Sequence, residues 1–169
     1  MYIKEVYKEF THLSEYTRSL GLLLLRLMLA YTFFKPAMLK WSDIDSVIQW
    51  FSYMGIPFAT LNAYMAATTE MLGVVLLTLG LFTRFISIPL LIIMFVAIAT
   101  VHGEHGFAFV NEAVQFSNAY VNGNLIEGTM IQLQNGYELV LYYILMLLIL
   151  VGNGAGKFSV DRLLFGEKN

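Results

Sequence analysis

Long apolar stretches that contain or adjoin an ionisable residue are the feature that most constrains how this chain can fold. Four such stretches read as membrane-spanning helices, at residues 20–40, 61–82, 85–102 and 137–152. A spanning helix needs about 20 mostly apolar residues. Charge inside hydrocarbon is costly, so ionisable residues in such helices usually face a bundle interior or a wet cavity and often mark function.

The composition supports a membrane protein. The chain has 169 residues, of which 58% are hydrophobic and 13% charged, whereas about a quarter of the residues of a typical soluble domain are charged. The prediction is a single all-α domain over residues 1–169, an integral membrane four-helix bundle with short amphipathic interfacial helices. The absence of cysteine excludes disulfides and thiolate metal sites. A net charge of -2 gives no reason to expect nucleic acid binding.

Two further segments have helical periodicity but are too polar or too short to span. Residues 1–19 fit an amphipathic helix lying in the membrane interface, with a solvated tail as the alternative. In residues 42–58, Asp43 can cap a short helix before Gly55 and Pro57 break it. One apolar face of this surface or re-entrant helix is formed by Ile44, Val47, Ile48, Phe51 and Met54.

Most basic residues fall on one side of the four-span arrangement, and the opposite side holds Lys40 near the end of the first span. Those on the first side are Lys4, Lys8, Arg18, Arg84, Lys157, Arg162 and Lys168. Cytoplasmic loops carry an excess of Lys and Arg. We therefore expect a multi-pass protein of the cytoplasmic (inner) membrane with both termini cytoplasmic and the loop 103–136 outside.

Helical spacing predicts which charged residues face the bundle interior. In the first span Arg26, Ala30, Phe33, Ala37 and Lys40 share a face. In the second span the shared face carries Ala66, Glu70, Gly73, Leu77, Gly80 and Arg84. In the fourth it carries Glu138, Tyr142, Leu145, Ile149 and Gly152. An extended Arg26 could meet Glu70 diagonally, which makes these two the candidate catalytic residues. A purely structural ion pair is an equally good interpretation.

A second group of polar residues is expected near the outer end of the spans. His102, Glu138, Lys40 and Tyr142 are the candidate ligand-binding residues at this mouth. His102 and His105 stand at i and i+3, and with Glu138 or Glu70 they could ligate a transition metal. Two histidines are a weak signal, and an interfacial pair bonded to the loop is the favoured interpretation.

Several short motifs, taken together, resemble the DoxX family of small bacterial and archaeal membrane proteins from about Leu20 to Leu164. The matching motifs are Leu22-Leu23-Leu24-Leu25-Arg26-Leu27, Lys40, Glu70-Met71-Leu72-Gly73, Leu79-Gly80-Leu81-Phe82-Thr83-Arg84, Val101-His102, Gly136-Tyr137-Glu138 and Gly152 to Asp161. The chain departs from the family pattern at Pro36-Ala37 and in its terminal glycine run.

The resemblance implies the architecture more strongly than the chemistry. Relatives that serve as membrane subunits of thiosulfate:quinone oxidoreductase suggest a redox-linked protein that binds a quinone or related small molecule. Whether the chain is an enzyme is left open by its residues. The alternatives are a non-enzymatic accessory or scaffold subunit that docks a partner protein through loop 103–136, and a small-solute or metal transporter, which would require a homo-oligomer.

Overall fold

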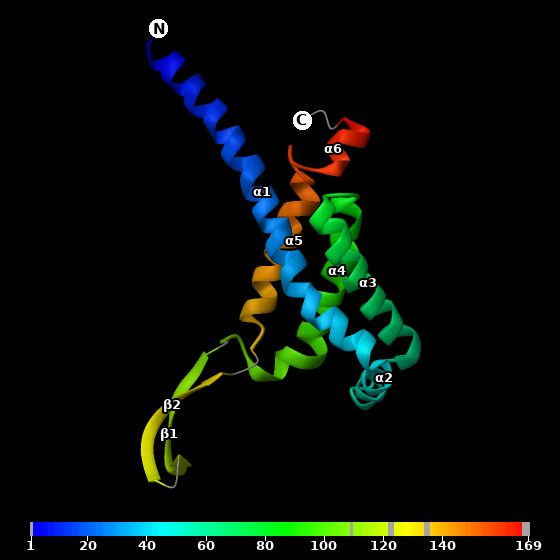
Figure 1. Ribbon diagram of the computed structural model, residues 1–169, viewed down its shortest axis with the longest axis vertical. Helices are drawn as coiled ribbons and strands as arrows, with labels where there is room; N and C mark the ends of the chain where they lie inside the picture. Colours follow the sequence, from blue (N-terminus) through cyan, green and yellow to red (C-terminus); the bar gives the residue numbers. More distant parts are fainter. Residues whose placement is uncertain (1, 109, 122–123, 134–135, 167–169) are drawn as a thin grey trace. The chain divides into compact units, whose positions relative to one another are not determined.

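The computed structural model describes the backbone of residues 2–108, 110–121, 124–133 and 136–166, and the side chains of 16–103, 105–108 and 136–166 (Figure 1). The chain divides into two compact units. Unit 1 comprises Met1–Ile93 and Ile144–Asn169, and unit 2 comprises Met94–Tyr143. Helices α4 (Thr83–Ala97) and α5 (Glu138–Asn153) pass from one unit into the other.

Among the described residues, three helical segments are long and apolar enough to cross a membrane: Tyr16–Ser42, Ala59–Leu79 and Thr83–His102. The first is the greater part of α1 (Tyr2–Ser42), which continues through Pro36. The second is α3 (Ala59–Leu79), and the third is α4 extended by a π-helical turn, Ile98–His102. The all-α membrane fold class is therefore confirmed. Helix α5 has 16 residues, fewer than the roughly 20 of a full span, so a fourth crossing stays a prediction.

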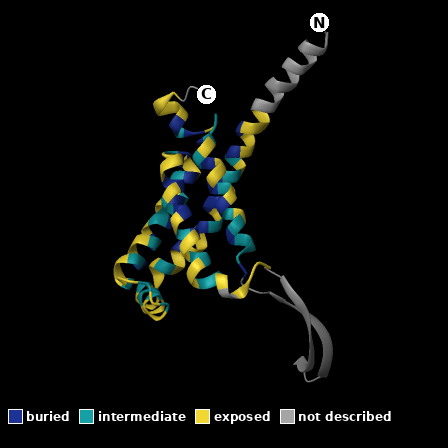
Figure 2. Ribbon diagram, turned by 180° about the vertical axis from the view of Figure 1, so that it is seen from behind, coloured by how far each residue is buried: buried dark blue, intermediate teal, exposed yellow. Residues whose placement is uncertain are grey.

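The core of unit 1 is built on the faces that helical spacing predicted for the first two spans. Arg26, Ala30, Phe33 and Ala37 of α1 are buried, and so are Glu70, Gly73 and Leu77 of α3 (Figure 2). At the ends of the predicted second face, Ala66 is half-buried and Arg84 is exposed, so the prediction is wrong for Arg84. Ala37, Ala63 and Ala67 have no exposed surface. Small side chains let two membrane helices approach closely, so α1 and α3 form the tightest seam of this unit.

The connection between α3 and α4 is a tight turn at Gly80–Phe82. Gly80 has φ +67° and Phe82 has φ +50°, a left-handed conformation that costs a non-glycine residue roughly 1–2 kcal/mol. The Phe82 amide donates to Asp161 Oδ1 at 2.7 Å and the Thr83 amide to Asp161 Oδ2 at 3.1 Å. The C-terminal segment thus caps α4 and holds the strained turn.

Helix α2 (Ile44–Tyr53) is the predicted amphipathic surface helix. It has no buried residue, and its half-buried positions, with Met54, are those of the predicted apolar face: Ile44, Val47, Ile48 and Phe51. Asp43 caps it by accepting a hydrogen bond from the Ser46 amide at 3.2 Å. Hydrogen bonding to Ser46 lowers the pKa of the Asp43 carboxyl, because it stabilises the charged form. The side chains of residues 1–15, predicted as a separate amphipathic helix, lie outside the described residues, while the backbone of α1 is continuous from Tyr2.

Unit 2 contains a β-hairpin within the segment 103–136. Strands β1 (Val110–Val121) and β2 (Asn124–Leu133) pair antiparallel, from Val110 opposite Leu133 to Val121 opposite Asn124, with two register shifts. Its base is closed where the Tyr137 amide donates to the Gly106 carbonyl and the Glu138 amide to the Phe107 carbonyl. The sequence analysis did not predict this hairpin, although the sequence contains a signal for it. The dipeptide Asn122-Gly123 stands between two β-prone stretches, and Asn-Gly is typical of hairpin turns.

The predicted inner face of the fourth apolar stretch is wrong. Tyr142, Leu145, Ile149 and Gly152 are exposed. The buried face of α5 carries Val140, Ile144, Leu147 and Leu150. The expected face was chosen by following helical spacing from Glu138, and a charged residue at the first position of a helix does not mark the side that packs.

We predict that Gly80→Ala destabilises the protein by about 2 kcal/mol or more. The alanine would have to adopt a positive φ, and its β-carbon would overlap the guanidinium group of Arg26. Gly152→Ala is the matched control, because a β-carbon at that position would have no atom within 4 Å and the φ of Gly152 is not positive. Thermal unfolding in detergent should show a lower Tm for the first variant and an unchanged or higher one for the second. Equal Tm values would contradict the arrangement of this turn.

Candidate functional site

A buried ion pair joins α1 to α3. Lys40 Nζ lies 2.8 Å from Glu70 Oε1 and 2.6 Å from Glu70 Oε2. The side chain of Glu70 is 3% exposed and that of Lys40 is 19% exposed. Lys40 ends the first span, whereas Glu70 stands within the second. A carboxylate at this depth is tolerable because the ammonium compensates its charge.

The two helices position this pair through backbone direction and small side chains. In an α-helix the side chains tilt toward the N-terminus, so Lys40 reaches back along α1 into the span. Ala37 on α1 and Ala67 on α3 are each one turn away and fully buried. They leave room for Lys40 and Glu70 to meet between the helix axes.

An aromatic contact also joins this end of α1 to α3. Trp41 and Tyr64 stack edge to face with ring centroids 6.0 Å apart, and both rings are partly exposed. Trp41 is the next residue after Lys40, and α2 packs against α3 nearby. The ammonium of Lys40 has three N–H donors, and the two bonds to Glu70 leave one for a carbonyl or other acceptor. The arrangement can therefore bind a small polar group and exchange a proton with it.

Arg26, the second candidate catalytic residue, is engaged elsewhere. Its side chain is fully buried, and Nη2 donates to the carbonyl oxygen of Phe158 at 2.5 Å. The nearest opposite charge is Asp161. Asp161 also anchors its own backbone, because its amide donates to the Gly80 carbonyl at 3.0 Å. Arg26 thus holds the C-terminal segment against the α3–α4 turn.

The expected contact between Arg26 and Glu70 is wrong. The guanidinium of Arg26 lies against Gly80, about 15 Å along α3 from Glu70 at a rise of about 1.5 Å per residue. The error has a geometric cause, because Arg26 points toward the N-terminus of α1 and α3 runs antiparallel to α1. Sequence reasoning also missed Asp161 as the partner. A buried arginine needs a counter-charge, and Asp161 lies in the terminal motif that resembles the family.

The remaining candidate residues lie in unit 2. Tyr142 donates its hydroxyl hydrogen to Glu138 Oε1 at 2.7 Å. His105 Nδ1 lies 3.1 Å from the Val101 carbonyl oxygen. His102 ends the π-helical turn. Both His102 and Glu138 make further interactions. Among the described residues no three His, Cys, Asp or Glu side chains form a group that could hold a metal ion. The structure joins Glu138 to Tyr142, and a ligand-binding role for His102, Glu138 and Tyr142 stays a prediction.

Comparisons with known proteins agree with the resemblance seen in the sequence. A family model described as DoxX matches residues 21–103, a range that contains Arg26, Lys40, Glu70 and His102. An uncharacterized protein of Haemophilus influenzae is 31% identical over 148 residues, which cover 85% of this chain and 83% of that one. A Bacillus subtilis protein named "Putative oxidoreductase CatD" is 34% identical over 82 residues, which cover 48% of this chain and 60% of that one. No solved structure matches the chain.

We predict that Lys40→Met destabilises the protein by about 3–5 kcal/mol, because it leaves the Glu70 carboxylate buried without a counter-charge. The double variant Lys40→Met/Glu70→Leu should recover most of this loss, since no charge is then buried. Thermal unfolding of both variants in detergent measures the effect. A double variant no more stable than Lys40→Met would contradict a direct pairing of the two side chains.

Proposed function

The chain belongs to the DoxX family of membrane proteins, and from that premise we propose that it is a redox-linked protein that binds a quinone or a related small molecule beside Lys40 and Glu70. The single observation that carries the proposal is the buried ion pair between α1 and α3. Ionisable residues inside membrane helices commonly mark substrate or proton pathways. The word oxidoreductase in the name of the Bacillus subtilis relative supports the same class of function.

The chemistry of the pair suits a quinone headgroup. Lys40 can donate its remaining N–H to a quinone carbonyl oxygen, and Glu70 can exchange a proton with the reduced form. The exposed faces of Trp41 and Tyr64 are flat and partly apolar, so they can lie against a ring. Lysine and glutamate side chains are not redox-active, so the pair cannot itself transfer electrons. An oxidoreductase role therefore requires a partner protein that holds a redox cofactor and delivers electrons to the bound quinone.

Arg26 has a structural part in this proposal. Its charge is directed to Phe158 and Asp161, and its removal would loosen the C-terminal segment before it affected a ligand at Lys40. His102, Glu138 and Tyr142 remain candidate residues for a second polar site in unit 2.

An accessory role is the second candidate, and the hairpin favours it. A two-stranded antiparallel sheet has two edges with unpaired backbone groups, and such edges accept a further strand from a partner. In this alternative, segment 103–136 docks the partner protein and the Lys40–Glu70 pair only stabilises the bundle. The two candidates differ in what Glu70→Gln does to ligand binding.

We predict that Glu70→Gln and Lys40→Gln each weaken binding of a short-chain benzoquinone or naphthoquinone analogue at least tenfold. A hydrogen bond to a charged group contributes about 1.5–3 kcal/mol, and about 1.4 kcal/mol corresponds to tenfold in Kd. Titration into the purified protein, with helicity checked by circular dichroism, gives the Kd. Lys35→Gln is the control, because Lys35 is an exposed lysine of the same span, and it should change Kd less than twofold. Equal Kd values in all four proteins would favour the accessory role.

We further propose that the protein lies in the cytoplasmic membrane with both termini in the cytoplasm, because Lys and Arg outside the spans concentrate on that side. The chain has no cysteine, so single cysteines report their location directly. In intact cells, Gln115→Cys in the hairpin should react with a membrane-impermeant maleimide. Leu163→Cys near the C-terminus should react only after the membrane is opened. The reverse pattern would invert the proposed orientation.

A further inference from the structure

We propose that the end of unit 1 that carries α6 (Val160–Phe165) binds an anionic glycerophospholipid, with Arg84 and Arg162 as the ligands of its phosphate. Phe82, Phe85 and Phe165 would lie against its acyl chains. The proposal concerns a site beyond the C-terminal end of α3, about 15 Å along the helix from Glu70 at a rise of about 1.5 Å per residue. It stands whether or not a quinone binds beside Lys40 and Glu70.

Asp161 holds together the two backbone segments that carry the arginines. Each arginine stands one residue from a hydrogen-bonded contact: Arg162 follows Asp161, and Arg84 follows Thr83, whose amide donates to Asp161 Oδ2 at 3.1 Å. The start of α6 is fixed as well, because the Arg162 amide donates to Ser159 Oγ at 3.3 Å. Both arginine side chains are exposed, and neither forms an ion pair with any residue whose side chain is described.

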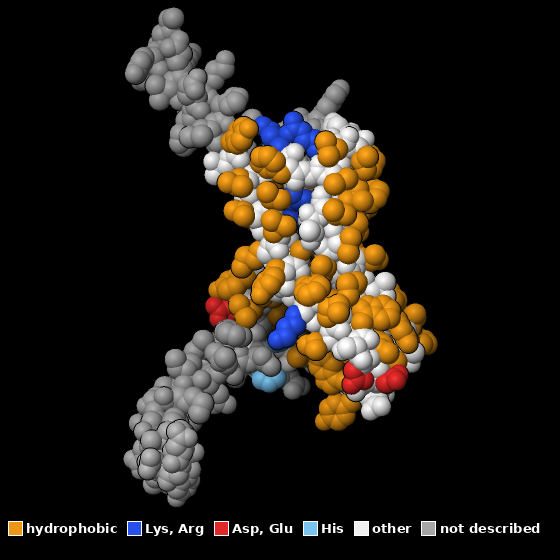
Figure 3. Space-filling view, in the orientation of Figure 1, with side chains coloured by type: hydrophobic (Ala, Val, Ile, Leu, Met, Phe, Trp, Pro, Cys, Tyr) orange, Lys and Arg blue, Asp and Glu red, His pale blue; other side chains and the backbone are white. Residues whose placement is uncertain are grey.

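Among the residues with described side chains, basic groups outnumber acidic ones at this end of the unit. Within residues 16–20, 80–86 and 153–166, Asp161 is the one acidic side chain, and it is buried with both of its oxygens occupied by backbone amides. The same segments carry four basic side chains: Arg18, Arg84, Lys157 and Arg162. Figure 3 shows Lys and Arg side chains gathered at this end of the unit, next to hydrophobic side chains.

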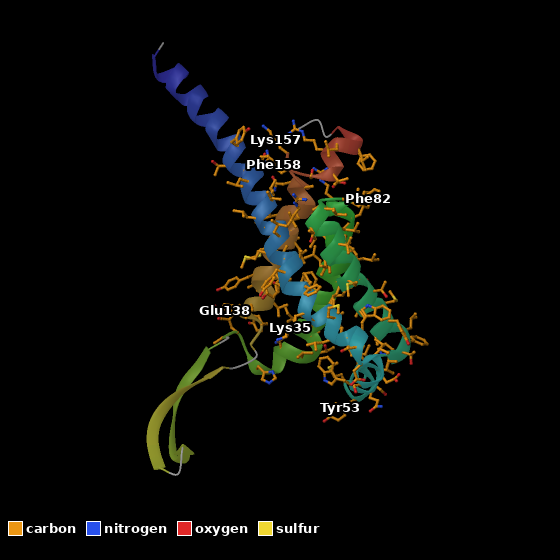
Figure 4. All side chains as sticks on the ribbon, viewed as in Figure 1. Lys35, Tyr53, Phe82, Glu138, Lys157 and Phe158 are labelled. Atoms are coloured by element: carbon orange, nitrogen blue, oxygen red, sulfur yellow. The ribbon has the colours of Figure 1, made fainter. Side chains whose placement is uncertain are left out.

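The apolar part of the surface continues the membrane-facing surface of the spans. Leu163, Leu164 and Phe165 are 84%, 63% and 60% exposed. The ring of Phe82 lies between Phe165, at 5.6 Å between centroids, and Phe85, at 6.3 Å. Figure 4 places Phe82, Phe158 and Lys157 together at this end. Exposed leucines and aromatic rings beside cations are typical of helices that lie in the lipid headgroup region.

Charge complementarity selects an anionic lipid over a zwitterionic one. Arginine binds phosphate through paired N–H groups, and this geometry is better satisfied by two arginines than by scattered lysines. In phosphatidylcholine the trimethylammonium group offsets the phosphate charge, so neighbouring cations gain little from it. In phosphatidylglycerol the phosphate charge is uncompensated. Juxtamembrane basic residues favour anionic surfaces by about 1 kcal/mol each, which corresponds to about fivefold in affinity for each cation.

Native mass spectrometry of the purified full chain, titrated with dioleoyl phosphatidylglycerol or dioleoyl phosphatidylcholine, tests the proposal. The wild type should bind phosphatidylglycerol at least tenfold more tightly than phosphatidylcholine. Arg84→Gln/Arg162→Gln should weaken phosphatidylglycerol binding about 25-fold, which is fivefold for each cation. The control Lys35→Gln removes a positive charge from an exposed lysine outside this cluster and leaves both ligands in place, so it should change that affinity less than twofold.

Three outcomes would overturn the proposal. Equal affinity of the wild type for the two lipids would exclude headgroup selection. An equal loss in the control would show that net charge, and not the Arg84–Arg162 site, attracts the lipid. Unchanged lipid binding in Arg84→Gln/Arg162→Gln, together with loss of a co-purifying protein, would make the surface a protein docking site. Circular dichroism of each variant verifies that it is folded.

Discussion

The cost of placing charge in hydrocarbon is the constraint on which the arrangement of unit 1 depends. Helix α1 carries two buried or half-buried cations, Arg26 and Lys40, about 21 Å apart along its axis at a rise of about 1.5 Å per residue. Each is compensated by a different part of the chain, Lys40 by Glu70 and Arg26 by the segment around Asp161. The two contacts fix the register of α1 against α3 at both ends, and small residues fill the seam between them.

The same constraint separates two kinds of chemistry within one unit. At one end of α3, Asp161 and Arg26 join three segments, because the carboxylate accepts from Phe82 and Thr83 and the guanidinium donates to Phe158. Toward the other, the two bonds from the ammonium of Lys40 to Glu70 leave one of its three N–H groups for another acceptor. The Lys40–Glu70 pair has a donor available for a ligand and is partly exposed, whereas Arg26 is fully buried. This difference is the physical basis for assigning ligand binding to Lys40 and Glu70 and a structural part to Arg26.

Periodicity in the sequence was sufficient to predict the membrane fold, the buried faces of α1 and α3 and the amphipathic helix α2. In these segments a single rule, apolar residues recurring with the helical period, decides which side packs. It failed for α5, where the face was inferred from Glu138 and the buried side is that of Ile144 and Leu147. It also could not identify charge partners. Pairing depends on helix direction and on contacts between residues far apart in the chain, such as Phe82 and Asp161, and periodicity contains neither. The hairpin was predictable in principle from Asn122-Gly123, a local signal that does not depend on tertiary contacts.

The pairing of Glu70 is the central claim, and its most direct test is a distance measurement in a bilayer. Solid-state NMR on protein labelled with ¹⁵N in lysine and arginine side chains and ¹³C in glutamate would report which nitrogen is next to the Glu70 carboxylate. We expect a strong correlation between Glu70 Cδ and Lys40 Nζ and none between Glu70 and the guanidinium of Arg26. A correlation between Glu70 and Arg26, or the absence of any nitrogen beside Glu70, would contradict the pairing and the site built on it.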